Sequence, residues 1–126
     1  SVGRVYAVDV KTGKFLWDKK QKPIFSSGVL TTGGGLVFTG DSMREFAAYD
    51  QNNGEKLWSI RLNTSIGGFP MTYSVDGKQY IAVVTGPNAQ TPPAAILSPE
   101  LKNVVDSGHS VFVFALDDIK AKNGKK

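Results

Sequence analysis

Alternating apolar and polar residues in the first part of the chain predict short β-strands joined by turns. Residues 4–9 alternate as the end of one strand, and residues 14–18 alternate as the start of the next. The apolar runs 28–32 and 36–39 flank three consecutive glycines, which is typical of a tight hairpin.

Two further strand patterns, at residues 45–49 and 56–62, follow the glycine hairpin. They complete four antiparallel strands between residues 28 and 62. Four strands joined by short turns are the unit from which a β-propeller blade is built. The pattern therefore predicts one complete blade in the middle of the chain.

One stretch of the chain is copied in register. Residues 7–17 and residues 48–58 each run from an alternating strand to an Asp, through a turn with a Gly, and into a strand that reaches a Trp. A repeat at this spacing indicates a solenoid or a propeller. The matched pairs, each 41 positions apart, are Ala7 and Ala48, Asp9 and Asp50, Gly13 and Gly54, and Trp17 and Trp58.

The chemistry of the copied stretch is that of a hairpin with a docking tryptophan. Asp and Asn side chains can bond to their own backbone in a turn, and Gly adopts positive φ without a steric penalty. A Trp at a fixed offset projects from the same point of every repeat, where it can pack between neighbouring repeats and donate its N–H to a backbone carbonyl. The alternative is a pair of ordinary core tryptophans. We assign the eight matched residues to a structural tryptophan-docking motif, with no part in catalysis.

A third repeat begins near residue 67. Residues 67–73 and 80–85 flank a turn at Asp76-Gly77, and residues 110–116 supply another strand. Residues 83–86 repeat residues 37–40 at a spacing of 46, whereas residues 115–117 repeat residues 48–50 at a spacing of 67. The difference, 67 − 46 = 21, predicts an insertion, in which Ser98-Pro99-Glu100 has the chemistry of a helix start.

These patterns predict an all-β fold of propeller blades, with a short helix near 98–106. Such a piece exposes sheet faces and edges at both ends, so we expect it to be part of a longer chain or one subunit of a split propeller. The expected segments are half a blade with its connection at 1–27, a complete four-stranded blade at 28–66, three strands of a last blade at 67–117 with an inserted loop at 86–109, and a basic tail at 118–126.

The charge of the chain lies mainly in its tail. The formal charge is +4, but four lysines lie in the last seven residues, and removing them leaves 15 − 4 = 11 basic against 11 acidic side chains. The pattern therefore does not favour nucleic-acid binding. The sequence has no Cys, and no apolar run approaches the 18 or more residues of a membrane span.

Other candidate chemistry is weak. His109 is the only histidine, which excludes a His-based metal cluster or triad within the chain, and a loop histidine before a strand is the simpler interpretation. Asp117-Asp118 is better explained as exposed acids that close a strand than as a cation site. Gly33-Gly34-Gly35 is a turn and not a phosphate loop, since no Lys or helix start follows it.

A specific resemblance covers nearly all of residues 4–86. The segments that carry it are Gly28 to Gly40 (GVLTTGGGLVFTG), Phe46 to Asp50 (FAAYD), Gly54 to Trp58 (GEKLW) and Asp76 to Val83 (DGKQYIAV). Together they resemble the large subunit of pyrroloquinoline quinone (PQQ)-dependent alcohol dehydrogenases of the methanol and ethanol type. The match is similar to the C-terminal end of that subunit, an eight-bladed propeller whose last blade is closed by a strand from the N-terminal region.

The resemblance implies oxidation of an alcohol or another hydroxylated substrate, with electrons passing through PQQ to a cytochrome c. It also implies a Ca²⁺ or lanthanide ion, a carboxylate base and a periplasmic location. The metal ligands and the base are expected upstream, in the remainder of the propeller chain. We therefore assign no catalytic or metal-binding residue here, and expect no turnover from this chain alone.

Two departures from the family pattern bear on the site. Where the family commonly has Pro-Leu-Trp close to the cofactor, this chain has residues 23–27, Pro-Ile-Phe-Ser-Ser, which makes Phe25 and Ser26 the candidate cofactor contacts. Where the family often has a Trp near the substrate, Pro87-Asn88 follows, which leaves room for a larger or more polar substrate. The alternative to an enzyme is a non-catalytic propeller scaffold, such as an outer-membrane assembly protein with the same repeat.

Overall fold

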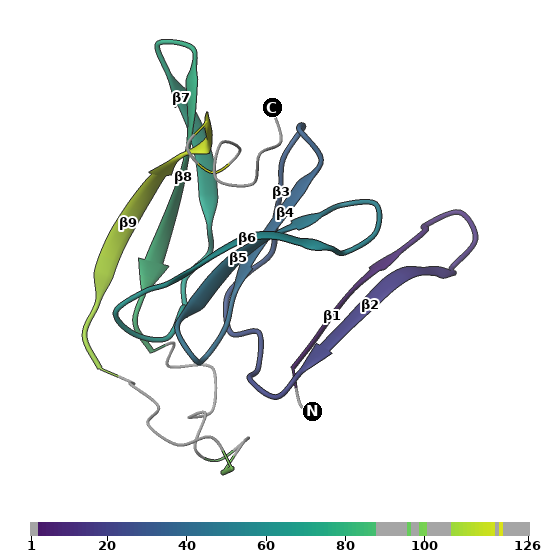
Figure 1. Ribbon diagram of the computed structural model, residues 1–126, viewed down its shortest axis with the longest axis horizontal. Helices are drawn as coiled ribbons and strands as arrows, with labels where there is room; N and C mark the ends of the chain where they lie inside the picture. The colour runs from purple at the N-terminus through teal and green to yellow at the C-terminus, as the bar shows by residue number, and fades with distance from the viewer. Residues whose placement is uncertain (1–2, 88–95, 97–98, 101–106, 118, 120–126) are drawn as a thin grey trace.

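Three antiparallel sheets make up the described part of this computed structural model, which covers residues 3–87, 96, 99–100, 107–117 and 119 (Figure 1). The all-β prediction is therefore confirmed. The first sheet pairs β1 (Gly3–Val8) with β2 (Phe15–Gln21). The second has the order β3 (Leu30–Thr31), β4 (Leu36–Gly40), β5 (Glu45–Asp50) and β6 (Lys56–Arg61). The third has the order β7 (Met71–Val75), β8 (Lys78–Thr85) and β9 (Ser110–Ala115).

The two copied hairpins have the same backbone geometry. In β1–β2, Ala7 lies opposite Trp17 and the register then shifts at Val8; in β5–β6, Ala48 lies opposite Trp58 and the register shifts at the next residue. Each turn closes with the Gly N–H donating to the Asp carbonyl, at 2.7 Å from Gly13 and 2.9 Å from Gly54. Both glycines have positive φ, as a turn of this kind requires. The sequence repeat is thus a structural repeat that includes its β-bulge.

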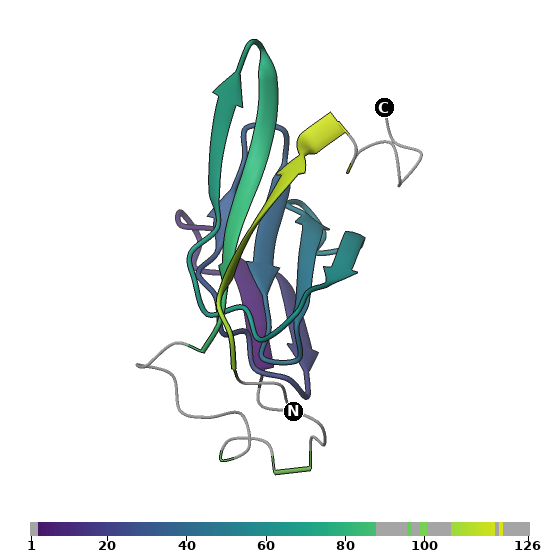
Figure 2. The same ribbon diagram turned by 90° about the vertical axis from the view of Figure 1, so that its left-hand side faces the viewer.

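The main hydrophobic core lies between the second and third sheets. Phe38 and Phe46 are fully buried on one face of the second sheet, and Ile81 and Val83 of β8 belong to the same cluster. A smaller cluster of Val37, Ala47 and Tyr49 lies on the opposite face of the second sheet, with Trp17 and Phe25 packed against it. The second sheet is therefore covered on both faces. Figure 1 shows the three sheets next to one another, and Figure 2 views them from the side of the third sheet.

The connections between strands divide into two groups by position. Tight turns follow β1, β3, β5 and β7; we call this the hairpin end of the sheets. The other group consists of residues 22–29, 41–44 and 62–70, with 86–87 and 107–109 beside the last sheet; we call this the loop end (Figure 1). Backbone contacts join the segments of the loop end, since Phe25 forms an isolated bridge with Asp41 and Ile66 forms one with Gly86.

One sequence equivalence is wrong. Residues 115–117 were expected to occupy the place that residues 48–50 hold, and residues 83–86 the place of 37–40. Ala48 pairs with Phe38, so the two spacings place Ala115 opposite Val84. Instead, Ala115 pairs with Tyr80, and Val84 pairs with Val111. The two equivalences cannot hold together, because β8 has eight residues where β4 has five and β9 pairs farther along it.

The predicted helix near 98–106 and the basic tail fall mainly outside the described residues. The structure describes residues 99–100 within the first and Ile119 within the second. Among the helical residues that are described, none belongs to a segment long and apolar enough to cross a membrane.

Candidate functional site

The docking residues of the first copy meet those of the second. The Trp17 indole N–H donates to the Gln51 carbonyl oxygen at 2.8 Å, within the hairpin turn of the second sheet. Its ring rests on Gly54, where an added Cβ would come within 2.8 Å of ring atoms. Trp17 thus uses a backbone carbonyl and a glycine surface of the neighbouring repeat, while Asp9 and Asp50 each accept an N–H from a residue two positions on.

Trp58 has different surroundings from Trp17. It is 7% exposed and packs edge-on against Phe114 of β9 at a centroid distance of 5.3 Å, and against Phe46 at 6.2 Å. Ala48 is fully buried opposite it. Trp17, Gly54, Ala48 and Trp58 therefore contribute packing between sheets, whereas Asp9, Asp50 and Gly13 shape the turns.

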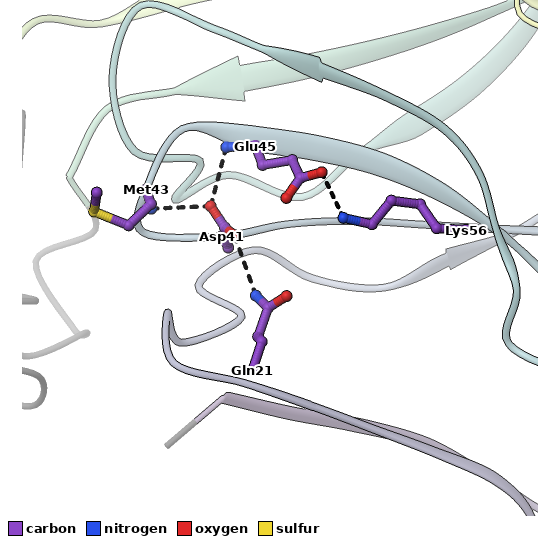
Figure 3. A network of polar contacts seen from close by, with 5 residues as sticks. All are labelled: Gln21, Asp41, Met43, Glu45 and Lys56. Atoms are coloured by element: carbon purple, nitrogen blue, oxygen red, sulfur yellow. Dashed lines mark hydrogen bonds and ion pairs between the residues drawn. The ribbon is translucent and has the colours of Figure 1, made fainter. Parts of the chain in front are cut away.

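A buried carboxylate, Asp41, organises the loop end (Figure 3). Its Oδ1 accepts the backbone N–H groups of Met43 at 2.9 Å and Glu45 at 3.0 Å, which closes the turn between β4 and β5. Its Oδ2 accepts the Gln21 side-chain amide at 3.1 Å, across to the first sheet. Figure 3 also shows Glu45 paired with Lys56 at 2.6 Å.

The backbone of Asp41 adds to these contacts. Its carbonyl accepts the Ile66 N–H at 3.1 Å, and the neighbouring Ser42 N–H donates to the Ile24 carbonyl at 3.0 Å. Only 3% of Asp41 is exposed, and this burial raises the pKa of its carboxyl, although its hydrogen bonds favour the charged form. One residue thus joins the first sheet, its own turn and both neighbouring connections.

The two candidate cofactor contacts lie at this end of the sheets. Phe25 is half-buried and packs against the cluster of Val37, Ala47 and Tyr49. The Ser26 hydroxyl donates to the Ile66 carbonyl at 2.8 Å, and its backbone N–H donates to the Gly40 carbonyl at 3.0 Å. Phe25 is therefore partly exposed, and the Ser26 hydroxyl oxygen can still accept a hydrogen bond.

Sequence reasoning missed the polar residues that hold the loop end together. Thr39 and Thr85 are both buried at the end of the second strand of a sheet. Thr39 Oγ1 lies 3.3 Å from the Ser27 hydroxyl, and Thr85 donates to Asn63 at 2.8 Å. The available signal is the Thr-Gly pair that lies at the end of each strand, Thr39-Gly40 and Thr85-Gly86.

The remaining candidate residues form no metal or catalytic site in the part of the chain that is described. Within it, no three His, Cys, Asp or Glu side chains come close enough to hold a metal ion. His109 packs over Gly86, where an added Cβ would meet its ring. Asp117 is exposed, and Asp118 lies outside the described residues.

Stacked antiparallel sheets, joined in sequence and locked by a repeated Trp, define a portion of a β-propeller. Residues 1–81 match the family model described as glucose/ethanol/alcohol dehydrogenase, β-propeller domain (PQQ). Since this match covers more than half of the chain, the chain belongs to the PQQ β-propeller family.

Relatives of this family are much longer than the chain. A quinoprotein ethanol dehydrogenase from Pseudomonas putida is 35% identical over 125 residues, which cover 99% of this chain and 20% of that protein. A lupanine 17-hydroxylase (cytochrome c) from a Pseudomonas species is 44% identical over 84 residues, 67% of this chain and 12% of that protein. The chain thus spans about a fifth or less of the length of these relatives.

Solved structures agree on the fold. A europium-containing methanol dehydrogenase matches 89% of this chain and 23% of its own, with a TM-score of 0.76 and 28% identity. The quinohemoprotein alcohol dehydrogenase from Comamonas testosteroni matches 66% of this chain and 12% of its own, with a TM-score of 0.62 and 36% identity. BamB from Moraxella catarrhalis matches 64% of this chain and 24% of its own, with a TM-score of 0.50 and 21% identity, which indicates the fold alone.

The family implies two bound groups, a quinone and a metal ion. The described residues fit the quinone better than they fit the metal ion. A partly exposed aromatic ring beside a hydroxyl, at Phe25 and Ser26, fits a peripheral contact to a planar quinone. The metal ion does not fit, because the described residues bring no set of acidic or histidine ligands together.

Proposed function

We propose that this chain supplies blades, at the C-terminal end as its sequence pattern suggests, to a PQQ-dependent dehydrogenase. The enzyme would oxidise an alcohol or another hydroxylated substrate. The observation that carries this proposal is the match of residues 1–81 to the propeller domain of that dehydrogenase family. It is supported by relatives named as alcohol, ethanol and 1-butanol dehydrogenases.

The loop end of the sheets is the face that we assign to the active site. Long connections carry binding and catalytic groups more often than tight hairpins do, because a rigid scaffold positions them without needing them for the sheet. Bound PQQ would accept two electrons from the substrate at this face. This chain would supply the wall of the site through residues 22–29, while the base and the Ca²⁺ or lanthanide ligands would come from other parts of the protein.

The electron acceptor and the location belong to the same proposal. We assign a cytochrome c as the acceptor, because two relatives are named for cytochrome c and others are named quinohemoproteins. A periplasmic location is the one expected for this chemistry.

The role of Phe25 can be tested directly. If Phe25 contacts the quinone, Phe25→Ala should weaken PQQ binding in the folded fraction of the intact protein, in addition to any stability lost from its packing on the smaller cluster. If it only packs between sheets, the truncation should cost about 3–5 kcal/mol of stability and leave quinone affinity unchanged in the folded fraction. Titration of PQQ into wild type and mutant, alongside thermal melts, separates the two roles.

A non-catalytic scaffold is the second candidate, because the contact of Trp17 with the turn of the next sheet suits a propeller of either kind. The two candidates differ in what the preceding blades contain. The sequence encoded upstream of this segment decides between them: carboxylates in metal-ligand and base positions support the enzyme, and their absence supports the scaffold.

A further inference from the structure

Asp41 is placed where three parts of the loop end meet. Its carboxylate accepts two N–H groups of its own turn and the amide of Gln21, the last residue of β2. Its backbone pairs with Phe25 on one side and accepts from Ile66 on the other. The residues that lead into β3 and those that lead toward β7 are therefore both fixed against it.

The connection that carries Phe25 and Ser26 is held by backbone hydrogen bonds to residues 40–42, besides the Ser26 hydroxyl bond to Ile66 and the packing of Phe25 on the smaller cluster. Ser26 and Ser27 donate their backbone N–H groups to the Gly40 carbonyl, the residue before Asp41, and Ile24 accepts from Ser42, the residue after it. These bonds all depend on the backbone position of residues 40–42. A displacement of the Asp41 turn would thus move the connection directly.

The chemistry of the site requires an acceptor at position 41. Removing the carboxylate leaves the Met43 and Glu45 N–H groups without their acceptor in a buried turn, and Gln21 without its partner. Asparagine keeps one oxygen for the two N–H groups, and Gln21 can rotate its amide so that its own oxygen accepts from Asn. The conservative variant should therefore preserve the turn, whereas alanine should not.

We propose that Asp41 is a positioning residue for the wall of the quinone site: it acts through Gln21 and the backbone of residues 40–42 to fix Phe25 and Ser26. It does not itself touch the cofactor. This inference rests on the proposed function, since it assigns Phe25 and Ser26 to a quinone site.

Hydrogen exchange of backbone amides in the protein that carries this chain tests the positioning. Asp41→Ala should speed exchange of the Ser26, Ser27 and Ser42 amides at least tenfold, and Asp41→Asn should restore rates close to wild type. Asp50→Ala is the matched control, because Asp50 accepts the Asn52 N–H in the same kind of turn at the hairpin end. It should speed exchange in its own turn only.

Quinone titration of the same variants tests the consequence. Asp41→Ala should raise the dissociation constant for PQQ at least tenfold in the folded fraction, with recovery in Asp41→Asn and no change in Asp50→Ala. Unchanged exchange at Ser26, Ser27 and Ser42 in Asp41→Ala, or an equal quinone effect in Asp50→Ala, would overturn the proposal. If the wild-type protein binds no PQQ, the proposed function fails, while the exchange rates still decide whether Asp41 fixes the connection.

Discussion

The hairpins of β1–β2 and β5–β6 share a sequence and a backbone but not an environment. Both have the Asp turn, the positive-φ glycine and the bulge before the Trp. Trp17 is only partly buried and docks on the turn of the second sheet, whereas Trp58 is 7% exposed among Phe46 and Phe114. Local sequence therefore determines the shape of the hairpin, and the neighbouring sheet determines how much its Trp contributes to stability.

Truncating the two tryptophans should give the largest contrast. Trp58→Ala should cost about 3–5 kcal/mol of unfolding free energy, because it empties a buried aromatic cluster, and Trp17→Ala should cost much less. Chemical denaturation of the two variants of this chain measures the difference. Equal shifts in the denaturation midpoints would show that the two environments are not as different as the structure indicates.

The two turn glycines should differ by a smaller amount. Gly13→Ala places a Cβ in open space at positive φ, with a cost of about 1–2 kcal/mol. Gly54→Ala adds a clash with the Trp17 ring, and overpacking of this kind costs about 1–3 kcal/mol more. Thermal melts of both variants, and of each combined with Trp17→Ala, check this. The excess cost at Gly54 should disappear when Trp17 is absent, and its persistence would contradict the docking contact.

The smallest expected contrast is in pH dependence, between Asp18 of the first sheet and Asp41 of the second. Burial raises the pKa of Asp41, so its folded form favours the proton, although Gln21 and the turn N–H groups oppose this. The stability that protonated Asp41 contributes is complete below the unfolded pKa near 3.8 and is lost as pH rises through the folded pKa. The Arg4 guanidinium lowers the pKa of Asp18. The charged form of Asp18 therefore stabilises the fold, and this contribution to stability is lost as pH falls.

Melting temperatures between pH 3 and pH 7 test this contrast in wild type, Asp41→Asn and Asp18→Asn. The stability of wild type relative to Asp41→Asn should fall as pH rises from 3.8. Its stability relative to Asp18→Asn should be nearly constant above pH 3.8 and fall slightly as pH drops below it, since Asp18 is exposed to solvent. A wild-type advantage over Asp41→Asn that grows with pH would contradict a raised pKa for the buried Asp41 carboxyl.

The sequence was informative where structure depends on neighbours along the chain. Asp9, Gly13 and their copies predicted the turns because an Asx bond and a positive φ involve only a few consecutive residues. The bulge before each Trp was not predicted, because it depends on the register between strands. Pairing across a long connection also failed, since Ala115 lies opposite Tyr80 and the spacing could not show that β8 is longer than β4.

The candidate site was less accessible to sequence reasoning than the fold. A family resemblance indicates Phe25 and Ser26, but no local pattern predicts that Phe25 packs on the smaller cluster or that Ser26 bonds to Ile66. Asp41 was overlooked because its partners, from Gln21 to Ile66, lie on three separate segments. Only the folded chain brings them to one point.

If these sheets belong to a quinoprotein dehydrogenase, the whole protein should oxidise alcohols with bound PQQ. The protein that carries this chain is reconstituted with PQQ and either Ca²⁺ or a lanthanide ion, and oxidation of a panel of alcohols is measured with an artificial electron acceptor. We expect alcohol oxidation that requires both PQQ and one of the ions. A folded protein that neither binds PQQ nor oxidises any hydroxylated substrate under these conditions would contradict it.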